Sequence, residues 1–355
     1  MRNKSREIVH TEAATEITPG PSVELTDLDR KLIAALQTDG RAAYSALAAT
    51  LGVSEATVQR RTQQLIDQGY FKIVGAVDPL RSGHGHAVVV ALQCDPQAMH
   101  QVADAVAAIP EMRFLTMVTG AYDIVCEMVT FDRQSTTEIL IGELGAIPGI
   151  RKVNTSWVLE TYKTNFRWDA LPASVNGAAA PVSDWNRLHG TERLVLDDLD
   201  QCIVRLLAEN GRASYAHMAA ELEVTISTVR RRTLRLLLSG YVMVVALGNP
   251  FRLGFEEVVL LWLKVELART AEVVQALERE PAIRYLSRVA GGVDILAEAF
   301  FPHRDDLLAF LDGPLAAIAG IREVALSFEL LIRKRAYTLF ESPESASEKR
   351  SDRIV

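Results

Sequence analysis

The chain has 355 residues, of which 49% are apolar and 23% charged, and a formal net charge of −7. This composition is that of a folded globular protein, and the length predicts two to four domains. We expect no membrane contact and no signal peptide, because no apolar run reaches ~18 residues and none follows the basic N-terminus. Three widely separated cysteines, Cys94, Cys126 and Cys202, argue against a disulfide framework and favour the reducing cytoplasm.

The chain is a tandem repeat. A shift of 171 positions places residues 28–79 on residues 199–250 without a gap, and 21 of these 52 positions are identical. The two repeated parts are called copy one and copy two below. Further matches follow along the chain: Pro110, Arg113, Gly120, Asp123, Glu127, Gly149 and Val153 correspond to Pro281, Arg284, Gly291, Asp294, Glu298, Gly320 and Val324. A unit of this length is a duplicated multidomain unit rather than a solenoid repeat.

The first half of each copy predicts three helices. In copy one, a capping-box pattern at Thr26-x-x-Asp29 begins a helix that runs to about residue 37. A second helix is expected over residues 44–51, and a third over residues 55–68 with Ser54 as its N-cap. The short turn between the second and third helices is the spacing of a helix-turn-helix unit. In copy two, Glu223 replaces the glycine expected at this turn, which puts its geometry in question.

The third helix predicts a DNA-reading face. Val58, Thr62 and Leu65 share one side, and polar residues cover the other. Arg and Gln suit the bidentate readout of guanine and adenine edges in the major groove. The predicted DNA-binding residues are Ser54, Glu55, Thr57, Gln59, Arg60, Arg61 and Gln63 in copy one, and Thr225, Ser227, Arg230, Arg231, Arg232 and Arg235 in copy two. Copy two is more basic and is expected to hold phosphates more strongly. A merely solvated charged face is the alternative.

A pattern spanning residues 36–79 carries a family resemblance. It consists of Leu36, Gly40-Arg41, Tyr44, Leu47-Ala48, Leu51-Gly-Val-Ser54, Val58, Arg60-Arg61, Leu65, Gly69-Tyr70 and a strand ending in Asp78-Pro79. This pattern resembles the DNA-binding half of the Lrp/AsnC regulators. The resemblance implies a winged helix-turn-helix domain in each copy and double-stranded DNA as a partner.

The second half of each copy predicts the order β-α-β-β-α-β of a ferredoxin-like domain. The expected elements of copy one are a strand at 86–93, a helix at 97–107, strands at 113–119 and 122–130, a helix at 134–145 and a strand at 152–160. Copy two repeats this order from residue 258 to about residue 333.

A Gly-x-x-Asp motif, Gly120–Asp123 in copy one and Gly291–Asp294 in copy two, resembles the effector loop of the same family's amino-acid-sensing domain. A carboxylate can pair with an α-ammonium group, and N–H groups beside a glycine can take an α-carboxylate. The resemblance implies effector binding by Thr119, Gly120, Ala121, Tyr122, Asp123 and Thr155, and by Gly291, Gly292 and Asp294. Copy two has Val293 and Leu326 in place of Tyr122 and Thr155, so we expect its effector binding to be lost or changed. The alternative is a tight turn whose Asp caps its own backbone.

These patterns together predict an α+β chain in which two winged helix-turn-helix domains alternate with two ferredoxin-like domains. The expected segments are a tail at 1–24, helix-turn-helix domains at 25–80 and 196–250, ferredoxin-like domains at 86–165 and 257–337, a linker at 169–193 and a tail at 341–355. In relatives, two chains pair through their sensor domains. We expect the two copies of this chain to form that pair internally, with further self-association into a homo-oligomer.

The predicted function is a transcriptional regulator that binds specific DNA and responds to a small amino-acid-like effector, without enzymatic activity, cofactor or metal. One alternative is an architectural DNA-binding protein with no effector response. The other is an enzyme, because siroheme decarboxylases are built from similar paired units. Those enzymes carry an Arg/His-rich signature around the hinge, whereas residues 78–86 here contain no His-Arg pair.

Overall fold

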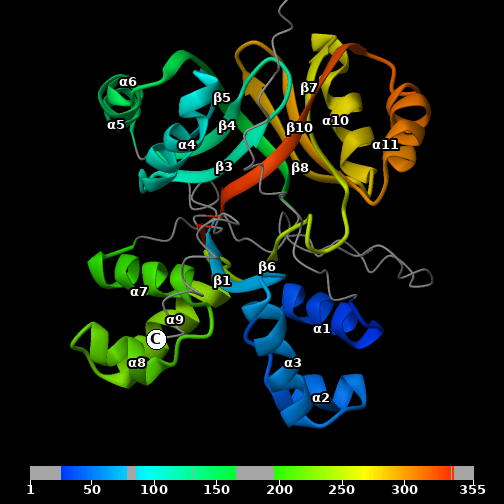
Figure 1. Cartoon of the computed structure of the whole chain (residues 1–355). Helices are drawn as coiled ribbons and strands as arrows, with labels where there is room; N and C mark the ends of the chain where they lie inside the picture. Colours follow the sequence, from blue (N-terminus) through cyan, green and yellow to red (C-terminus); the bar gives the residue numbers. More distant parts are fainter. Residues whose placement is uncertain (1–24, 78–84, 131, 165–195, 337, 340–355) are drawn as a thin grey trace, which may run out of the picture.

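The computed structural model describes residues 25–77, 85–130, 132–164, 196–336 and 338–339. It has two tiers (Figure 1). Two three-helix heads form one tier, and two helix-covered sheets lie side by side in the other. Of the helices described, none is both long and apolar enough to cross a membrane.

The heads contain the six expected helices. Their bounds are α1 (Asp27–Thr38), α2 (Tyr44–Leu51), α3 (Glu55–Asp67), α7 (Asp198–Glu209), α8 (Tyr215–Glu221) and α9 (Ile226–Leu238). The predicted capping box of Thr26 and Asp29 is confirmed, and Asp197 and Asp200 form the same arrangement before α7. Buried side chains of Val58, Thr62 and Leu65 confirm the inner face of α3.

One ribbon joins the two heads. It consists of β1 (Phe71–Val77) and β6 (Val242–Gly248), paired antiparallel so that Phe71 lies opposite Gly248. The strand that follows the third helix of each copy therefore pairs with its counterpart in the other copy. We refer to this pair of strands as the hinge ribbon.

Each sheet domain has the predicted β-α-β-β-α-β order. In copy one the elements are β2 (His86–Cys94), η2 (Pro96–Ala98) with α4 (Met99–Ala108), β3 (Met112–Val118), β4 (Ile124–Thr130), α5 (Arg133–Thr137), the π-helical η3 (Glu138–Glu143), α6 (Leu144–Ala146) and β5 (Ile150–Thr164). In copy two they are β7 (Glu257–Val265), η4 (Leu267–Arg269) with α10 (Thr270–Arg279), β8 (Ile283–Ala290), β9 (Ile295–Phe301), α11 (Arg304–Phe310), the π-helical η5 (Leu311–Leu315), β10 (Ile321–Arg335) and the short β11 (Thr338–Leu339).

The last strand of each domain is longer than the sequence predicts, because it pairs with both copies. The first part of β5 pairs with β2 and places Thr155 opposite Val90, and the second part pairs with β8 and places Thr161 opposite Ser287. Strand β10 pairs in the same way with β7 and then with β3. Eight strands therefore close into a ring, β10-β3-β4-β2-β5-β8-β9-β7.

The inner faces of the two sheets pack against each other. Val89 and Val125 of copy one share a buried cluster with Leu260, Trp262 and Leu296 of copy two. Separate clusters on the outer faces bury α4 against the first sheet and α10 against the second. The two copies of one chain thus form a pair by themselves, as we expected.

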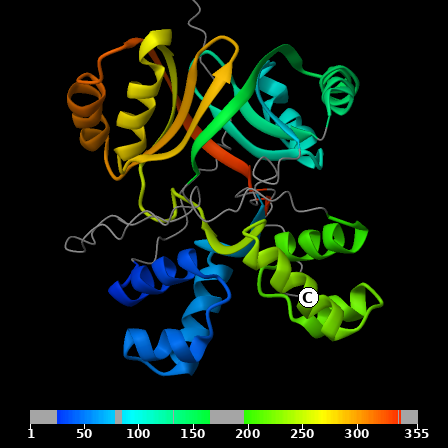
Figure 2. The same cartoon turned by 180° about the vertical axis from the view of Figure 1, so that it is seen from behind.

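The chain crosses over between the tiers. The head of copy one lies against the sheet domain of copy two, and the reverse holds for the other head (Figures 1 and 2). Leu253, Phe255 and Phe300 of copy two complete the core of the first head. Two buried lysines lock the sheet domains reciprocally: Lys163 Nζ donates to the carbonyl oxygens of Glu278 and Glu280, and Lys334 Nζ to those of Ala107 and Ile109.

Candidate DNA-reading helices and effector loops

The outer face of α3 presents the side chains predicted to read DNA. Glu55, Gln59, Arg60 and Gln63 are exposed. Ser54 begins the helix, and its hydroxyl accepts the backbone N–H of Thr57 at 3.2 Å, which satisfies one of the free N–H groups of the first turn. Gln59 and Arg60 are therefore accessible on the outer face of α3.

Arg61 has another role. Its Nε donates to Asp29 Oδ1 at 2.8 Å, and Nη2 pairs with Oδ2 of the same carboxylate. Burial raises the pKa of Asp29, but hydrogen bonds from Arg61 and Thr26 outweigh it, and the net shift is downward from the usual 3.8. The pair holds α3 against α1, so the Arg61 guanidinium has a partner within the head. Its predicted contact with DNA stays a prediction.

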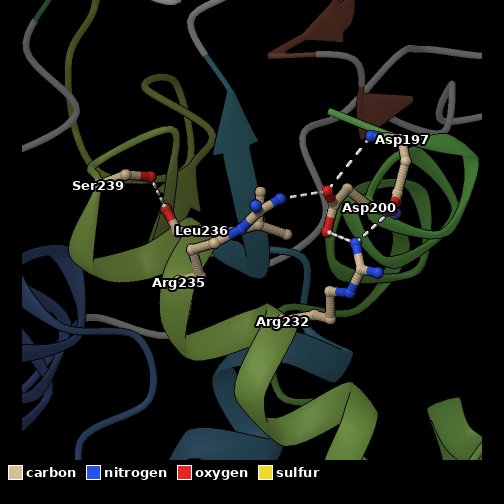
Figure 3. A network of polar contacts seen from close by, with 6 residues as sticks. All are labelled: Asp197, Asp200, Arg232, Arg235, Leu236 and Ser239. Atoms are coloured by element: carbon tan, nitrogen blue, oxygen red, sulfur yellow. Dashed lines mark hydrogen bonds and ion pairs between the residues drawn. The ribbon is translucent and has the colours of Figure 1, made fainter. Parts of the chain in front are cut away.

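Copy two repeats and extends this network (Figure 3). Arg232, the counterpart of Arg61, donates to Asp197 Oδ2 at 2.5 Å and lies 3.2 Å from Asp200 Oδ1. Arg235 pairs with the other oxygen of Asp200. The backbone N–H of Asp200 and the Arg232 guanidinium lower the pKa of Asp197. Arg232 and Arg235 thus both contact α7, while Arg235 is also exposed to solvent. Their contact with DNA stays a prediction.

The remaining face of α9 differs from that of α3. Arg230 and Arg231 are exposed, as is Ser227 near the N-cap residue Thr225, whose hydroxyl accepts the Thr228 N–H at 3.2 Å. Apolar residues replace three polar ones of α3: Ile226, Leu234 and Leu238 are 55%, 39% and 85% exposed, where copy one has Glu55, Gln63 and Asp67. The two faces have the same geometry and different chemistry.

A reciprocal joint fixes one head against the other. Arg41 donates to the carbonyl oxygens of Gly211 and Ala213 at 2.8 and 3.1 Å, and Arg212 donates to that of Ala42 at 2.6 Å. Each guanidinium lies over a tyrosine of the opposite head, Arg41 at 5.2 Å from the Tyr215 ring centroid and Arg212 at 4.1 Å from that of Tyr44. The pattern Gly-Arg-Ala-x-Tyr occurs at residues 40–44 and again at residues 211–215 of the sequence. Its two appearances in one chain were the available signal for this joint.

The glycines of that signature allow the close approach. Gly40 N donates to Val244 O and Gly211 N to Ile73 O, both at 2.8 Å. A Cβ on Gly211 would lie 2.7 Å from a Val244 methyl group and 2.9 Å from the Val74 carbonyl carbon. The heads are therefore docked on the hinge ribbon through their own turns.

The loop between β3 and β4 contains the Gly-x-x-Asp motif. Gly120 has φ +102°, which glycine adopts readily. Asp123 is half-buried, and its Oδ2 accepts the backbone N–H of Cys94 at 2.8 Å. Asp294 holds Val265 N in the same way at 2.9 Å. The carboxylate therefore fastens its loop to the neighbouring strand in both copies. This contact differs from the turn alternative, in which the Asp caps its own backbone.

The other predicted effector residues lie around this loop. Thr119 contacts copy two: its N–H donates to Phe328 O at 2.9 Å, and its hydroxyl accepts the Phe328 N–H at 3.1 Å. The Tyr122 ring packs against Trp262 at 5.4 Å between centroids, and so it serves the interface between the sheets. Ala121, Gly291, Gly292 and Thr155 are exposed. The register places Thr155 opposite Val90, one strand away from Asp123.

A set of buried charges inside the strand ring was not predicted. Arg113 pairs with Glu127, and the equivalent residues of copy two, Arg284 and Glu298, are buried as well. The repeat had shown both pairs as matching charged residues within apolar strands, which was the signal for them. No group of three or more metal-ligating side chains occurs within the described ranges.

Comparison with known families matches both halves of both copies. The model of the AsnC-type helix-turn-helix domain matches residues 25–66 and 196–237, and that of the Lrp/AsnC ligand-binding domain matches residues 87–168 and 258–339. The chain belongs to the Lrp/AsnC family. Its duplication gives it two DNA-binding and two ligand-binding domains of this family in one polypeptide.

Curated relatives match this chain over less than half of its length and over most of their own. The chain is 31% identical over 145 residues to an uncharacterised HTH-type transcriptional regulator of Pyrococcus abyssi, covering 41% of this chain and 92% of the relative. It is 32% identical over 143 residues to one of Pyrococcus furiosus, covering 40% of this chain and 97% of the relative.

The duplicated arrangement also occurs in a solved structure. The siroheme decarboxylase NirDL superposes with a TM-score of 0.57 over 92% of this chain and 98% of that one, at 12% identity. At this identity the likeness shows a shared fold and nothing about the reaction.

Proposed function

We propose that the chain is a transcriptional regulator that binds specific DNA through α3 and α9 and answers to a small amino-acid-like effector. The observation that carries the proposal is the pair of third helices, α3 and α9, each with an exposed outer face. Both lie in the helical tier of the molecule (Figure 1), and the Arg41 and Arg212 joint holds their heads together. Two recognition helices in such a rigid pair suit successive major-groove segments about one helical turn apart.

The two helices favour unequal half-sites. Copy one offers Gln59 and Arg60, which match adenine and guanine edges. Copy two offers Arg230 and Arg231 with the exposed Leu234, a combination suited to guanine edges, phosphates and thymine methyl groups. The preferred site is therefore pseudo-palindromic with two different halves. A symmetric consensus from a random DNA library would contradict this assignment.

We propose that the effector binds at the Gly120–Asp123 loop together with Thr155. Asp123 is half-buried and can pair with an α-ammonium group while it holds the loop. In copy two the Leu326 and Val293 substitutions remove polar groups from the equivalent position. Copy one is therefore the main effector site.

Self-association would bring a second chain to this region. Val153 is 37% exposed beside Thr155 on β5, and its counterpart Val324 on β10 is 38% exposed. Exposed apolar side chains in matching positions of both copies support a homo-oligomer in which the effector lies at the contact. Native mass measurement at micromolar concentration tests this, and a strict monomer with and without amino acids would contradict it.

The decisive experiment is DNA binding by the full chain. A labelled fragment from upstream of its own gene and a scrambled fragment are titrated across a salt series, with and without each free amino acid. We expect preference for the upstream fragment, a fall in affinity with salt of about 0.9 logarithmic units per phosphate contact and decade of salt, and a shift with one amino acid. Asp123→Asn should remove the shift, and Asp294→Asn should reduce it less.

Absence of specific binding at every salt concentration would contradict the proposal. Turnover of an iron tetrapyrrole precursor would then test the decarboxylase alternative that shares this fold.

A regulator of this kind would work in the cytoplasm, where the buried Cys94 stays reduced. Burial raises the pKa of this thiol to about 11, which makes it unreactive.

A further inference from the structure

The two third helices differ at a pair of positions that lie one helical turn apart. In α3 these positions hold Gln63 and Asp67, and in α9 the equivalent positions hold Leu234 and Leu238. Gln63 Nε2 donates to Asp67 Oδ1 at 2.8 Å. All four side chains are exposed to solvent. A hydrogen-bonded polar pair in copy one is therefore replaced by an apolar pair in copy two.

Gln63 lies on the outer face of α3. It follows Gln59 by four residues and Arg60 by three, so the three side chains point to the same side of the helix. The neighbouring Thr62 is buried against the head. Gln63 thus lies among the residues proposed to contact base edges, and Asp67 is the last residue of the helix.

The carboxylate of Asp67 determines which way the Gln63 amide points. A carboxylate only accepts hydrogen bonds, whereas an amide has an NH₂ group that donates and a carbonyl oxygen that accepts. The NH₂ group of Gln63 must therefore face Asp67, and the carbonyl oxygen is turned away from it. Hydrogen bonds between glutamine and aspartate at this spacing are favourable on a helix surface.

An amide held in this way discriminates between base edges. Adenine and cytosine each present an amino group in the major groove, which donates to a carbonyl oxygen, whereas guanine and thymine present carbonyl oxygens there. The carbonyl oxygen of Gln63 accepts from the first two bases and is repelled by the last two. An amide free to turn over would offer its NH₂ group to guanine or thymine. Adenine is favoured further, because the second N–H of Gln63 can donate to its N7 atom.

We propose that Asp67 is a positioning residue, which makes Gln63 prefer adenine or cytosine over guanine or thymine on the strand that it contacts. The inference rests on the proposed function of α3 in DNA binding, and it adds the base preference of one residue and its physical cause. Leu234 and Leu238 offer no such hydrogen bonds, so this preference belongs to the copy-one half-site alone.

DNA binding by the full chain tests the inference. A site is selected from a random library of double-stranded DNA with the native chain, and each base of the site is then varied. Gln63→Ala identifies the position that Gln63 contacts, because the preference should be lost there alone.

At this position Asp67→Asn should relax the preference. An asparagine both donates and accepts, so it lets the Gln63 amide turn over. We expect the ratio of affinities for adenine or cytosine over guanine or thymine to fall by at least about fivefold, the lower end of the discrimination given by one good contact with a base edge.

Further variants separate positioning from charge. Asp27→Asn removes a carboxylate that is 76% exposed on α1 and paired with Lys31. It changes the charge of the same head and should leave the base preference unchanged. Leu234→Gln with Leu238→Asp places the polar pair on α9, and it should give the second half-site the adenine or cytosine preference more strongly than Leu234→Gln alone.

The failure of the inference and that of the proposed function are distinguishable. If the native chain binds specific DNA, an unchanged ratio in Asp67→Asn, an equal fall in Asp27→Asn, or no loss of preference in Gln63→Ala would overturn the inference alone. An equal effect of the single and double variants of α9 would do the same. Absence of specific binding by the native chain would overturn both. Thermal unfolding of each variant verifies that it folds.

Discussion

Copy one and copy two agree where their heads hold each other and differ on the exposed faces of their third helices. The carboxylates Asp29 and Asp200 each fasten a third helix through an arginine, and Arg41 and Arg212 each reach across to the opposite head. By contrast, the exposed positions of α3 carry Glu55 and Gln63 where α9 carries Ile226 and Leu234. The contacts that join the heads are thus repeated in both copies, whereas the exposed faces of α3 and α9 differ.

This comparison separates structural arginines from those available to a ligand. Arg60 and Arg61 are adjacent on one helix, yet only Arg60 is exposed. In copy two the same division falls between Arg231 and Arg232. Part of the positive charge of α3 and α9 is thus paired with carboxylates of the same head.

The largest expected effect comes from breaking the joint between the heads. Arg41→Ala with Arg212→Ala removes three hydrogen bonds to carbonyl groups and two ring contacts. Since hydrogen bonds to charged groups contribute about 1.5–3 kcal/mol and these side chains are partly exposed, we expect a loss of about 3 kcal/mol in the free energy of unfolding. Chemical denaturation measures it. Arg304→Ala is the matched control, and an equal loss there would count against the joint.

The second-largest effect is expected at the carboxylate that holds each third helix, which is Asp29 in copy one and Asp200 in copy two. Asp29→Asn should lower the free energy of unfolding by about 2 kcal/mol, because it removes a buried partner of Arg61. Asp200→Asn should have a larger effect, since Asp200 holds both Arg232 and Arg235. Thermal unfolding of the two variants shows which one loses more stability. A larger loss for Asp29→Asn would show that the pair of Arg235 with Asp200 adds no stability.

The Asp29 carboxylate should make the free energy of unfolding depend on pH. The folded-state pKa of Asp29 is lowered, so its contribution is complete above the usual value of 3.8 and is lost as the pH falls through the folded pKa. The stability difference between the native chain and Asp29→Asn should therefore be constant near neutrality and shrink below about pH 4. Denaturation at a series of pH values measures this difference. A difference that persists unchanged at pH 2 would exclude an ionic origin.

The exposed arginines should affect DNA binding and leave stability unchanged. We expect Arg60→Ala and Arg231→Ala each to weaken binding by about 1–2 kcal/mol, or roughly five- to thirtyfold. If Arg231 contacts phosphate, the Arg231→Ala variant reduces the slope of log affinity against log salt by the amount expected for one phosphate contact, and it keeps the sequence preference. If Arg60 reads a base, its variant relaxes preference at one position. Fluorescence anisotropy across salt and site variants distinguishes these results.

The sequence predicted the local structure well because local signals determine it. The capping box of Thr26 and Asp29, apolar periodicity and Gly52 located the three helices of the first head within a residue or two. The full lengths of β5 and β10 could not be predicted from the sequence pattern, because the second part of each strand pairs with a strand of the opposite copy. The same holds for Arg61: spacing places it on the polar side of α3, and only the position of Asp29 in space decides its partner.

The smallest expected effect concerns the turn before the third helix. Gly52 and Glu223 occupy equivalent positions, with φ +70° and +53°, and this region is unfavourable for a residue with a Cβ atom. Glu223→Gly should therefore raise the free energy of unfolding by a few tenths to about 1 kcal/mol, after the gain in unfolded-chain entropy offsets part of the relieved strain. The reciprocal change Gly52→Glu should destabilise copy one by a similar amount, since a Cβ there meets no atom within 4 Å and backbone strain is the only cost. Denaturation curves of the two variants and of the native chain measure both changes in the free energy of unfolding and show whether each is a gain or a loss. If Glu223→Gly destabilises the chain instead, the Glu223 side chain makes a contact that outweighs the strain, and the two turns are not equivalent.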